Sequence, residues 1–393
     1  VAIEPNTGYV KAWVGDIDFD TWKYDKVTAM RQPGSTFKLF VYTEAMNQGL
    51  TPCDKRRDEY ISMRVYDKFK KEYVTWAPTN ANGYFTGDSI PLKAAFAQSI
   101  NSIAVKLGQE VGIDNIVNTA HAMGIQSPLD NTPSLALGSS DVNLLELVNA
   151  YCTVVNDGMA LEPILVTRIL DRNGDEVYSC NTEQKQAIPY KSAFLMQQML
   201  LGGLREPGGT SMSLWSYVRK FSDTEFGGKT GTSNNHSDAW FVGISPKIVV
   251  GAWVGGEYRS IHFRTGALGQ GSRTALPICG YFLESLMSDP AFKRYRGKFA
   301  KPTDEISYEM YNCSSYYRKR ETADSTKNDS VMNMGSAEEN VLFDSNSSEN
   351  GNTKTDRNQF PEKSTNRSTN QQSTESQNEE RHNKKSKYEE VYF

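Results

Sequence analysis

The segment 31–38, which reads Arg-Gln-Pro-Gly-Ser-Thr-Phe-Lys, constrains the local fold more than any other part of the chain. Pro33 and Gly34 readily form a turn, and the residues that follow predict a helix that begins near Ser35. Residues i and i+3 of a helix share a face, so the amine of Lys38 can reach the hydroxyl of Ser35 and take its proton. The free N–H groups of the first turn can also stabilise an oxyanion. The segment therefore predicts a nucleophile and its base on one helical turn.

Two further motifs follow, Ser99-Ile100-Asn101 and Lys229-Thr230-Gly231-Thr232. This order of Ser-x-x-Lys, Ser-x-Asn and Lys-Thr-Gly is the one found in serine acyl-transferases that act on D-Ala-D-Ala peptides and β-lactams. Ser-x-Asn alone is weak, because it recurs at 233–235, 348–350 and 376–378. Ser35, however, is the only serine with a lysine three residues later, and Lys-Thr-Gly occurs once. The combination favours catalysis over a capping serine followed by a surface lysine.

With these motifs the chain resembles the transpeptidase domain of a class A, bifunctional penicillin-binding protein, within the superfamily of serine transpeptidases and β-lactamases. The resemblance runs from residue 1 to about residue 285. It rests on the three motifs together with Arg31-Gln32-Pro33-Gly34, Trp76, Pro78, Asn80, Gly83, Gly87, the segment Ala136-Leu137-Gly138-Ser139-Ser140, Gly228 and the segment Asp238-Ala239-Trp240-Phe241-Val242-Gly243. Leu39 departs from the family pattern, which often has Pro there, and affects helix packing rather than chemistry.

The resemblance implies a serine D,D-transpeptidase that cross-links peptidoglycan stem peptides and is trapped covalently by β-lactams. Ser35 would be the acylation nucleophile and Lys38 its general base. Lys38 would have to be partly neutral, which burial and the nearby cation of Lys229 would favour. Ser99 would relay a proton between Lys38 and the leaving nitrogen.

The remaining motif residues would bind the substrate. The amide of Asn101 would hydrogen-bond the peptide group of the substrate. Lys229 and the hydroxyls of Thr230 and Thr232 would bind the carboxylate of the donor peptide or the β-lactam. Gly231 would let the substrate lie along the strand, and the N–H groups of Thr232 and Ser35 would form the oxyanion hole.

Composition excludes several other classes of function. A formal net charge of −4 on 393 residues does not suggest a nucleic-acid partner. Five scattered cysteines and four histidines form no metal-ligand pattern, so we expect no metal and no cofactor. One disulfide is neither required nor excluded, although Cys152 and Cys279 lie in apolar stretches typical of buried free thiols. We expect His236 to be a loop imidazole.

The segment after the third motif is expected to be structural. Trp240 and Phe241 fit a core strand, and Asp238 receives no catalytic role.

No stretch is long and apolar enough to span a membrane. Residues 1–5 already read as a strand, so we expect the chain to begin inside a longer polypeptide. In class A proteins the missing part holds a membrane anchor and a glycosyltransferase domain. The resemblance thus places the domain on the extracytoplasmic face of the bacterial membrane, with other cell-wall synthesis proteins as possible partners.

The pattern of apolar residues predicts an α+β fold, a largely antiparallel sheet flanked by helices with an all-helical subdomain that carries Ser99 at a break between helices. Strands are expected at 1–4, 9–14, 228–232, 239–244 and 248–254, and helices at 39–50, 92–97, 103–107, 144–155, 192–201 and 275–286. We place the transpeptidase domain at 1–300 and a low-complexity tail at 301–393. Residues 320–393 hold too few large apolar groups to offset the entropy of ordering, so we predict disorder, with 388–393 as an end that could dock.

Three other functions stay open. A β-lactamase needs a deacylation base such as the Glu of a Glu-x-x-x-Asn motif. Glu162 begins such a pattern, but Val166 stands where Asn is needed. The segment 162–166 looks more like a strand that leads to 171–174. A D,D-carboxypeptidase would transfer the acyl group to water. A penicillin-binding sensor or scaffold domain would keep Ser35 and Lys38 without turnover.

Overall fold

A five-stranded antiparallel sheet forms the centre of the fold in the computed structural model, which describes residues 1–18, 20, 24–67, 70–314 and 316. The strand order is β11 (Gly227–Thr232), β12 (Asp238–Ile244), β13 (Val249–Gly255), β1 (Ala2–Ile3) and β2 (Val10–Ala12). β1 therefore lies between its hairpin partner β2 and β13, with Ala2 opposite Val250. The predicted initial hairpin, the later strands and the antiparallel sheet are confirmed.

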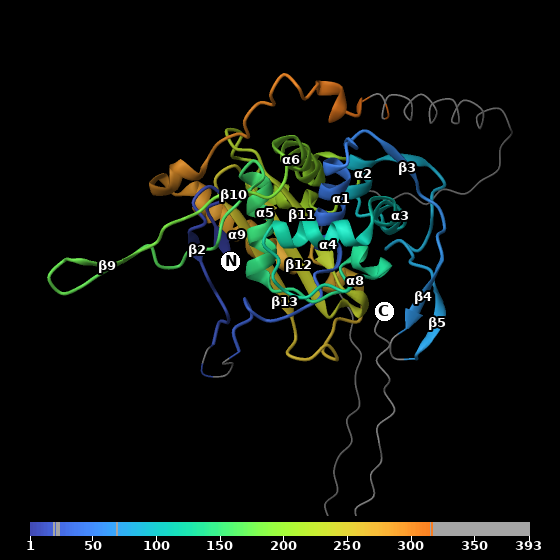
Figure 1. The fold of residues 1–393 in the computed structure, drawn as a ribbon, viewed down its shortest axis with the longest axis horizontal. Helices are drawn as coiled ribbons and strands as arrows, with labels where there is room; N and C mark the ends of the chain where they lie inside the picture. The colour runs from blue at the N-terminus through green and yellow to red at the C-terminus, as the bar shows by residue number, and fades with distance from the viewer. Residues whose placement is uncertain (19, 21–23, 68–69, 315, 317–393) are drawn as a thin grey trace, which may run out of the picture. The chain divides into compact units, whose positions relative to one another are not determined.

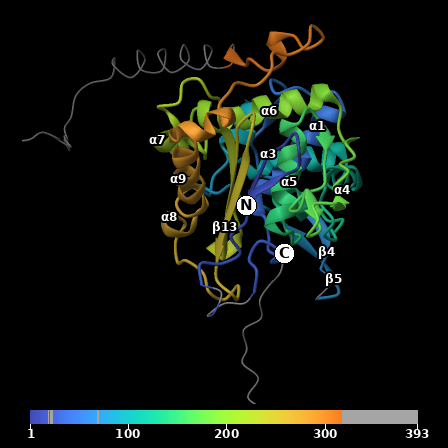
Figure 2. The same ribbon diagram turned by 90° about the vertical axis from the view of Figure 1, so that its left-hand side faces the viewer.

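Helices cover both faces of the sheet (Figure 2). α9 (Ala275–Ser288) packs on one face against β12 and β13, while α5 (Leu144–Val155) and α6 (Tyr190–Arg205) pack on the other side. Successive residues of β12 point to opposite faces, so Trp240 belongs to the core under α5 and α6 and Phe241 to the core under α9. Each large side chain buried this way contributes about 1.5–3 kcal/mol of hydrophobic stabilisation.

The helical subdomain surrounds α1 (Lys38–Asn47), as Figure 1 shows. Every residue of α1 from Lys38 to Met46 is buried, which is typical of a helix enclosed on all sides. α2 (Leu92–Ala97), α3 (Asn101–Val111) and α4 (Ile113–Ala122) complete this subdomain. Ser99 lies between α2 and α3, which confirms the predicted break.

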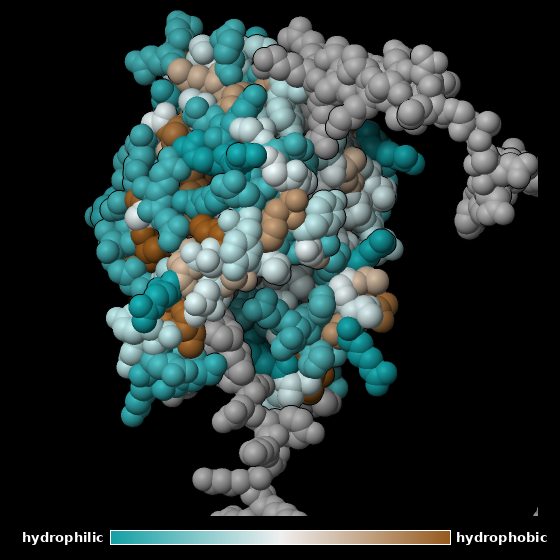
Figure 3. All heavy atoms as spheres, turned by 90° about the vertical axis from the view of Figure 1, so that its right-hand side faces the viewer, coloured by the Kyte–Doolittle hydropathy of each residue, from teal (hydrophilic) through white to brown (hydrophobic). Residues whose placement is uncertain are grey.

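The remaining elements are short. Among the described residues, two-stranded sheets pair β3 (Lys55–Arg57) with β6 (Ser89–Pro91), β4 (Met63–Asp67) with β5 (Glu72–Trp76), β7 (Met159–Ala160) with β10 (Lys185–Gln186), and β8 (Arg168–Leu170) with β9 (Glu176–Ser179). The face that carries β3 to β5 is mostly hydrophilic with small separate apolar patches (Figure 3). Short helices occur at α7 (Trp215–Val218), α8 (Gly266–Gly269), η1 (Gly34–Phe37), η2 (Pro133–Leu137), η3 (Met212–Leu214), η4 (Asn234–His236), η5 (Pro290–Tyr295) and η6 (Tyr308–Met310).

The segment 162–166, predicted as a strand, makes only one bridge, between Ile164 and Tyr9. The strand starts later, at Arg168 in β8. The apolar pattern was misleading because Ile164 is buried by docking beside the β1–β2 turn rather than by pairing in a ladder.

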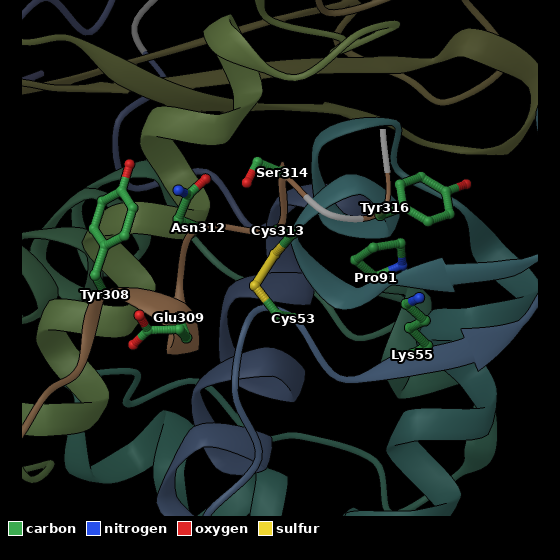
Figure 4. A pocket seen from close by; sticks show the side chains of 9 residues that line it. All are labelled: Cys53, Lys55, Pro91, Tyr308, Glu309, Asn312, Cys313, Ser314 and Tyr316. Carbon is green, nitrogen blue, oxygen red and sulfur yellow. A yellow bond between two sulfur atoms is a disulfide. The ribbon is translucent and has the colours of Figure 1, made fainter. Parts of the chain in front are cut away.

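The chain continues to pack against the domain beyond residue 300. Cys313 forms a disulfide with Cys53, next to a pocket that Figure 4 shows. The ring of Tyr311 lies 5.3 Å from that of Phe194 on α6, and the carbonyl oxygen of Tyr311 accepts from Lys93 Nζ on α2 at 3.0 Å. Cys152 and Cys279 are buried free thiols, as predicted. The predicted disorder at 320–393 lies outside the described residues.

Candidate active site

The turn that holds Ser35 is packed between β11 and η2. Gly34 has φ +53°, and a Cβ there would lie 2.5 Å from the carbonyl oxygen of Thr232. On the other side, a Cβ on Gly138 would lie 2.2 Å from the carbonyl oxygen of Gly34. Only glycine allows both this backbone conformation and these approaches. The turn thereby leaves Ser35 half-buried in η1, one turn before the fully buried Lys38.

The amine of Lys38 points at the second motif. Its Nζ donates to the carbonyl oxygen of Ser99 at 2.8 Å and to Oδ1 of Asn101 at 2.7 Å. Burial, and secondly the charge of Lys229, hold the pKa of Lys38 well below its usual value. A lysine with a lowered pKa can be neutral and accept a proton, which the general-base role predicted for Lys38 needs.

The hydroxyl of Ser99 lies between two amines. Its Oγ is 2.9 Å from Nζ of Lys229 and 3.4 Å from Nζ of Lys38. Ser99 adopts a left-handed backbone conformation with φ +60°. Such a conformation costs on the order of 1–3 kcal/mol in a residue with a side chain and persists only where neighbours hold it. Here the N–H of Ser99 donates to the carbonyl oxygen of Phe96, and the carbonyl oxygen of Ser99 accepts from Nζ of Lys38.

The amide of Asn101 is held by a protein group at each end. Its Nδ2 donates to the carbonyl oxygen of Thr79 at 2.8 Å, while Oδ1 accepts from Lys38. The side chain of Asn80 caps α3 by accepting from the N–H groups of Asn101 and Ser102. Asp58, 1% exposed, in turn accepts from Asn80 and Ser102. These bonds use one of the two N–H groups of Nδ2 and one of the two lone pairs of Oδ1, so the amide can still bond a substrate.

The third motif lies on β11, an edge strand of the sheet. Lys229 is buried, and burial lowers its pKa to about 7. Its Nζ also donates to the carbonyl oxygen of Thr230 at 2.9 Å. A Cβ on Gly231 would lie 2.4 Å from the carbonyl oxygen of Pro33, so glycine is needed here for the close approach of β11 to the Ser35 turn. The hydroxyl of Thr232 accepts from the N–H of Gly271 at 3.2 Å.

All eight predicted site residues therefore come from three elements that meet: the η1–α1 junction, the α2–α3 break and β11. η1 contacts β11 directly, and the amines of Lys38 and Lys229 reach the Ser99 hydroxyl. Sequence reasoning missed Asp58 and Thr210; Thr210 forms a hydrogen bond between its hydroxyl and that of Thr230 at 2.7 Å. Neither residue belongs to a local motif, so no signal in the sequence distinguishes them from other polar residues.

Residues near the third motif have structural roles. Asp238 is fully buried and accepts from Ser233, Ser237 and the indole of Trp253. Trp240 and Phe241 are fully buried, which confirms them as core. His236 lies in the η4 turn. Within the described part of the chain, no group of His, Cys, Asp and Glu side chains could hold a metal ion.

The chain is similar in sequence to known proteins. The family model described as the penicillin-binding protein transpeptidase domain matches residues 1–255. Penicillin-binding protein 2D of Bacillus subtilis is 35% identical over 262 residues, which cover 66% of this chain and 37% of the relative. Penicillin-binding protein 1A of Rickettsia felis is 34% identical over 313 residues, or 74% of this chain and 38% of the relative. The chain thus spans well under half the length of these relatives.

Solved structures show the same fold. Penicillin-binding protein 1A of Haemophilus influenzae aligns with a TM-score of 0.69 and 24% identity over 78% of this chain and 49% of that chain. The PonA1 protein of Mycobacterium tuberculosis, in complex with penicillin V, aligns with a TM-score of 0.62 and 21% identity over 77% of this chain and 80% of that chain.

Proposed function

The chain belongs to the penicillin-binding protein transpeptidase family, and we propose that it is a serine D,D-transpeptidase that cross-links peptidoglycan stem peptides. The observation that carries this proposal is the position of the Ser99 hydroxyl between the amines of Lys38 and Lys229, next to the turn that holds Ser35. Two buried amines with lowered pKa values and a hydroxyl between them form a proton-transfer unit.

In the first step, Ser35 Oγ attacks the carbonyl carbon of the penultimate D-Ala, and the proton of the hydroxyl passes to Nζ of Lys38. The N–H groups of Ser35 and Thr232 stabilise the negative oxygen that develops. The C–N bond to the terminal D-Ala then breaks, and the leaving nitrogen takes a proton through Ser99. This step leaves an ester between Ser35 and the stem peptide, and Lys38 neutral again.

In the second step, the amine of a neighbouring stem peptide attacks the ester and loses its proton to the same unit. An amide forms between the two peptides, and Ser35 regains its proton. A β-lactam reacts through the first step only, because its opened ring stays attached and blocks the acceptor.

Substrate recognition uses β11 and Asn101. The carboxylate of the donor peptide binds near Lys229 and the hydroxyls of Thr230 and Thr232. Hydrogen bonds to a charged group are stronger than those between neutral groups, so they contribute most to binding here. An extended peptide pairs with β11, the edge strand of the sheet, a common way to orient such a substrate. Asn101 hydrogen-bonds the peptide group through the second N–H of Nδ2 while the first stays on Thr79.

The wider setting is also a proposal. The matched relatives are longer than this chain, and the full-length protein would carry a membrane anchor and a glycosyltransferase domain ahead of the transpeptidase, on the extracytoplasmic face of the membrane. Cell-wall synthesis proteins would be its partners. Among the described residues, the helices are all too short or too polar to cross a bilayer.

The position of Glu162 argues against a β-lactamase. This residue is exposed, and its carbonyl oxygen packs against Gly8 beside the β1–β2 turn rather than at the site.

Incubation with natural stem peptides tests the proposal, with cross-linked dimers measured by mass spectrometry. We expect dimers from the wild type and none from Ser35→Ala, and covalent labelling by fluorescent penicillin that maps to Ser35. Labelling of Ser35 without dimers would favour the sensor or scaffold. Release of D-Ala without dimers would indicate a carboxypeptidase, and labelling of Ser35→Ala at the wild-type rate would refute the nucleophile.

A further inference from the structure

Thr210 belongs to none of the three motifs, yet it contacts two of the elements that form the site. Its hydroxyl lies 2.7 Å from the hydroxyl of Thr230 on β11. Its backbone N–H donates to the carbonyl oxygen of Ala97 at 2.9 Å. Ala97 ends α2, two residues before Ser99. Thr210 therefore joins the strand of the third motif to the helix that leads to the second.

The loop at 206–211 holds Thr210 in place. The hydroxyl of Ser211 donates to the carbonyl oxygen of Gly228 on β11 at 3.1 Å, and Gln98 donates to that of Pro207 at 3.0 Å. A Cβ on Gly209 would lie 2.4 Å from the carbonyl oxygen of Gly203, so the loop packs directly on α6. The side chain of Thr210 is thus fixed against β11 from both ends of the loop.

A pair of hydroxyls can reverse the direction of its hydrogen bond. Each hydroxyl has one proton to donate and two lone pairs to accept with. In the free enzyme the Thr230 hydroxyl donates to Thr210. A bound carboxylate only accepts, so Thr230 must turn its proton toward the ligand, and its oxygen then accepts from Thr210. The Thr210 hydroxyl keeps the Thr230 oxygen paired in both states.

We propose that Thr210 is a positioning residue for carboxylate recognition, acting through Thr230. This inference rests on the proposed function. The Thr210 hydroxyl then raises the rate of acylation only for ligands whose carboxylate is free. A purely structural role of the loop would affect all ligands equally.

Thr210→Val tests this, because valine keeps the shape of the side chain and deletes the hydroxyl. We measure the second-order rate constant of acylation for a β-lactam and for its methyl ester. Loss of one neutral hydrogen bond predicts a fall of about two- to tenfold for the acid. The ester, whose carboxylate is masked, should change little. Thr210→Ser keeps the hydroxyl and should acylate with the free-acid β-lactam at close to the wild-type rate. If the valine variant does not fold, Thr210→Ala replaces it in the same measurement.

Ser211→Ala is the matched control, since it removes a hydrogen bond between the same loop and β11 without touching Thr230. We expect it to lower the thermal midpoint and to leave the ratio of acid to ester rates unchanged. Equal losses for acid and ester in Thr210→Val, or no rescue by serine, would overturn the inference. Failure of wild-type labelling at Ser35 would instead refute the proposed function itself.

Discussion

Lys229 Nζ lies 2.9 Å from the hydroxyl of Ser99, across 130 residues of sequence. This contact connects the edge strand of the sheet with the break between two helices. Because burial lowers the pKa of Lys229 to about 7, its amine can be present in either protonation state near neutral pH. The contact therefore links the strand that we propose binds the carboxylate to the group of amines and hydroxyl that we propose activates Ser35.

Replacing Lys38 by arginine should abolish acylation. A guanidinium stays protonated and cannot accept the proton of Ser35. Loss of a general base predicts a fall in the acylation rate of about 10²- to 10⁴-fold, measured with fluorescent penicillin. Lys38→Ala should fail similarly, and Lys220→Arg, at an exposed lysine, should react as wild type. Unchanged kinetics in a folded Lys38→Arg protein would remove the general-base role.

Lys229 should make folding stability depend on pH. Its pKa is about 7 in the folded protein and about 10.4 in the unfolded chain, so the unfolded chain binds more protons between these values. The free energy of unfolding should therefore rise with pH in this window, by about 3 kcal/mol from pH 7 to 9.5 for this residue. Denaturant unfolding of wild type and Lys229→Met measures the difference. An equal pH dependence in both proteins would contradict the lowered pKa.

Thr232→Val should slow acylation mainly through weaker carboxylate recognition. Valine keeps the backbone N–H and deletes one hydroxyl, and a hydrogen bond to a charged group contributes about 1.5–3 kcal/mol, or about ten- to a hundredfold. An esterified β-lactam should react poorly with wild type and lose little more in the variant. An equal loss for acid and ester would point to the oxyanion hole or to the contact between Thr232 and Gly271.

The disulfide between Cys53 and Cys313 should stabilise the domain without taking part in catalysis. It links residues separated by 260 positions, and removing such a bridge typically costs about 2–4 kcal/mol. Cys53→Ser/Cys313→Ser should lower the free energy of unfolding by that amount and acylate at close to the wild-type rate. Cys180→Ser, at a free thiol, is the control. A large loss of acylation in the folded double variant would show that the segment containing Tyr311 supports the site through Lys93 on α2.

The sequence alone determined the features that depend on near neighbours in the chain. Ser35 and Lys38 are three residues apart, and they lie on one helical turn, where the N–H of Lys38 donates to the carbonyl oxygen of Ser35. The alternation in 239–244 predicted a core strand because side chains of a strand point to opposite faces, and Trp240 and Phe241 indeed enter the two separate cores. Local periodicity likewise located the break at Ser99, where it separates α2 from α3.

Only the tertiary structure decided the contacts between distant segments. Three contacts join residues with no local pattern between them: the capping of α3 by Asn80, whose side chain Asp58 holds, the hydroxyl pair of Thr210 and Thr230, and the disulfide between Cys53 and Cys313. Gly34 and Gly231 belong to motifs, but the reason for glycine at both is the packing of η1 on β11. Such contacts arise from how whole elements pack, and spacing along the chain carries information only over a few residues, so they could not be predicted from the sequence.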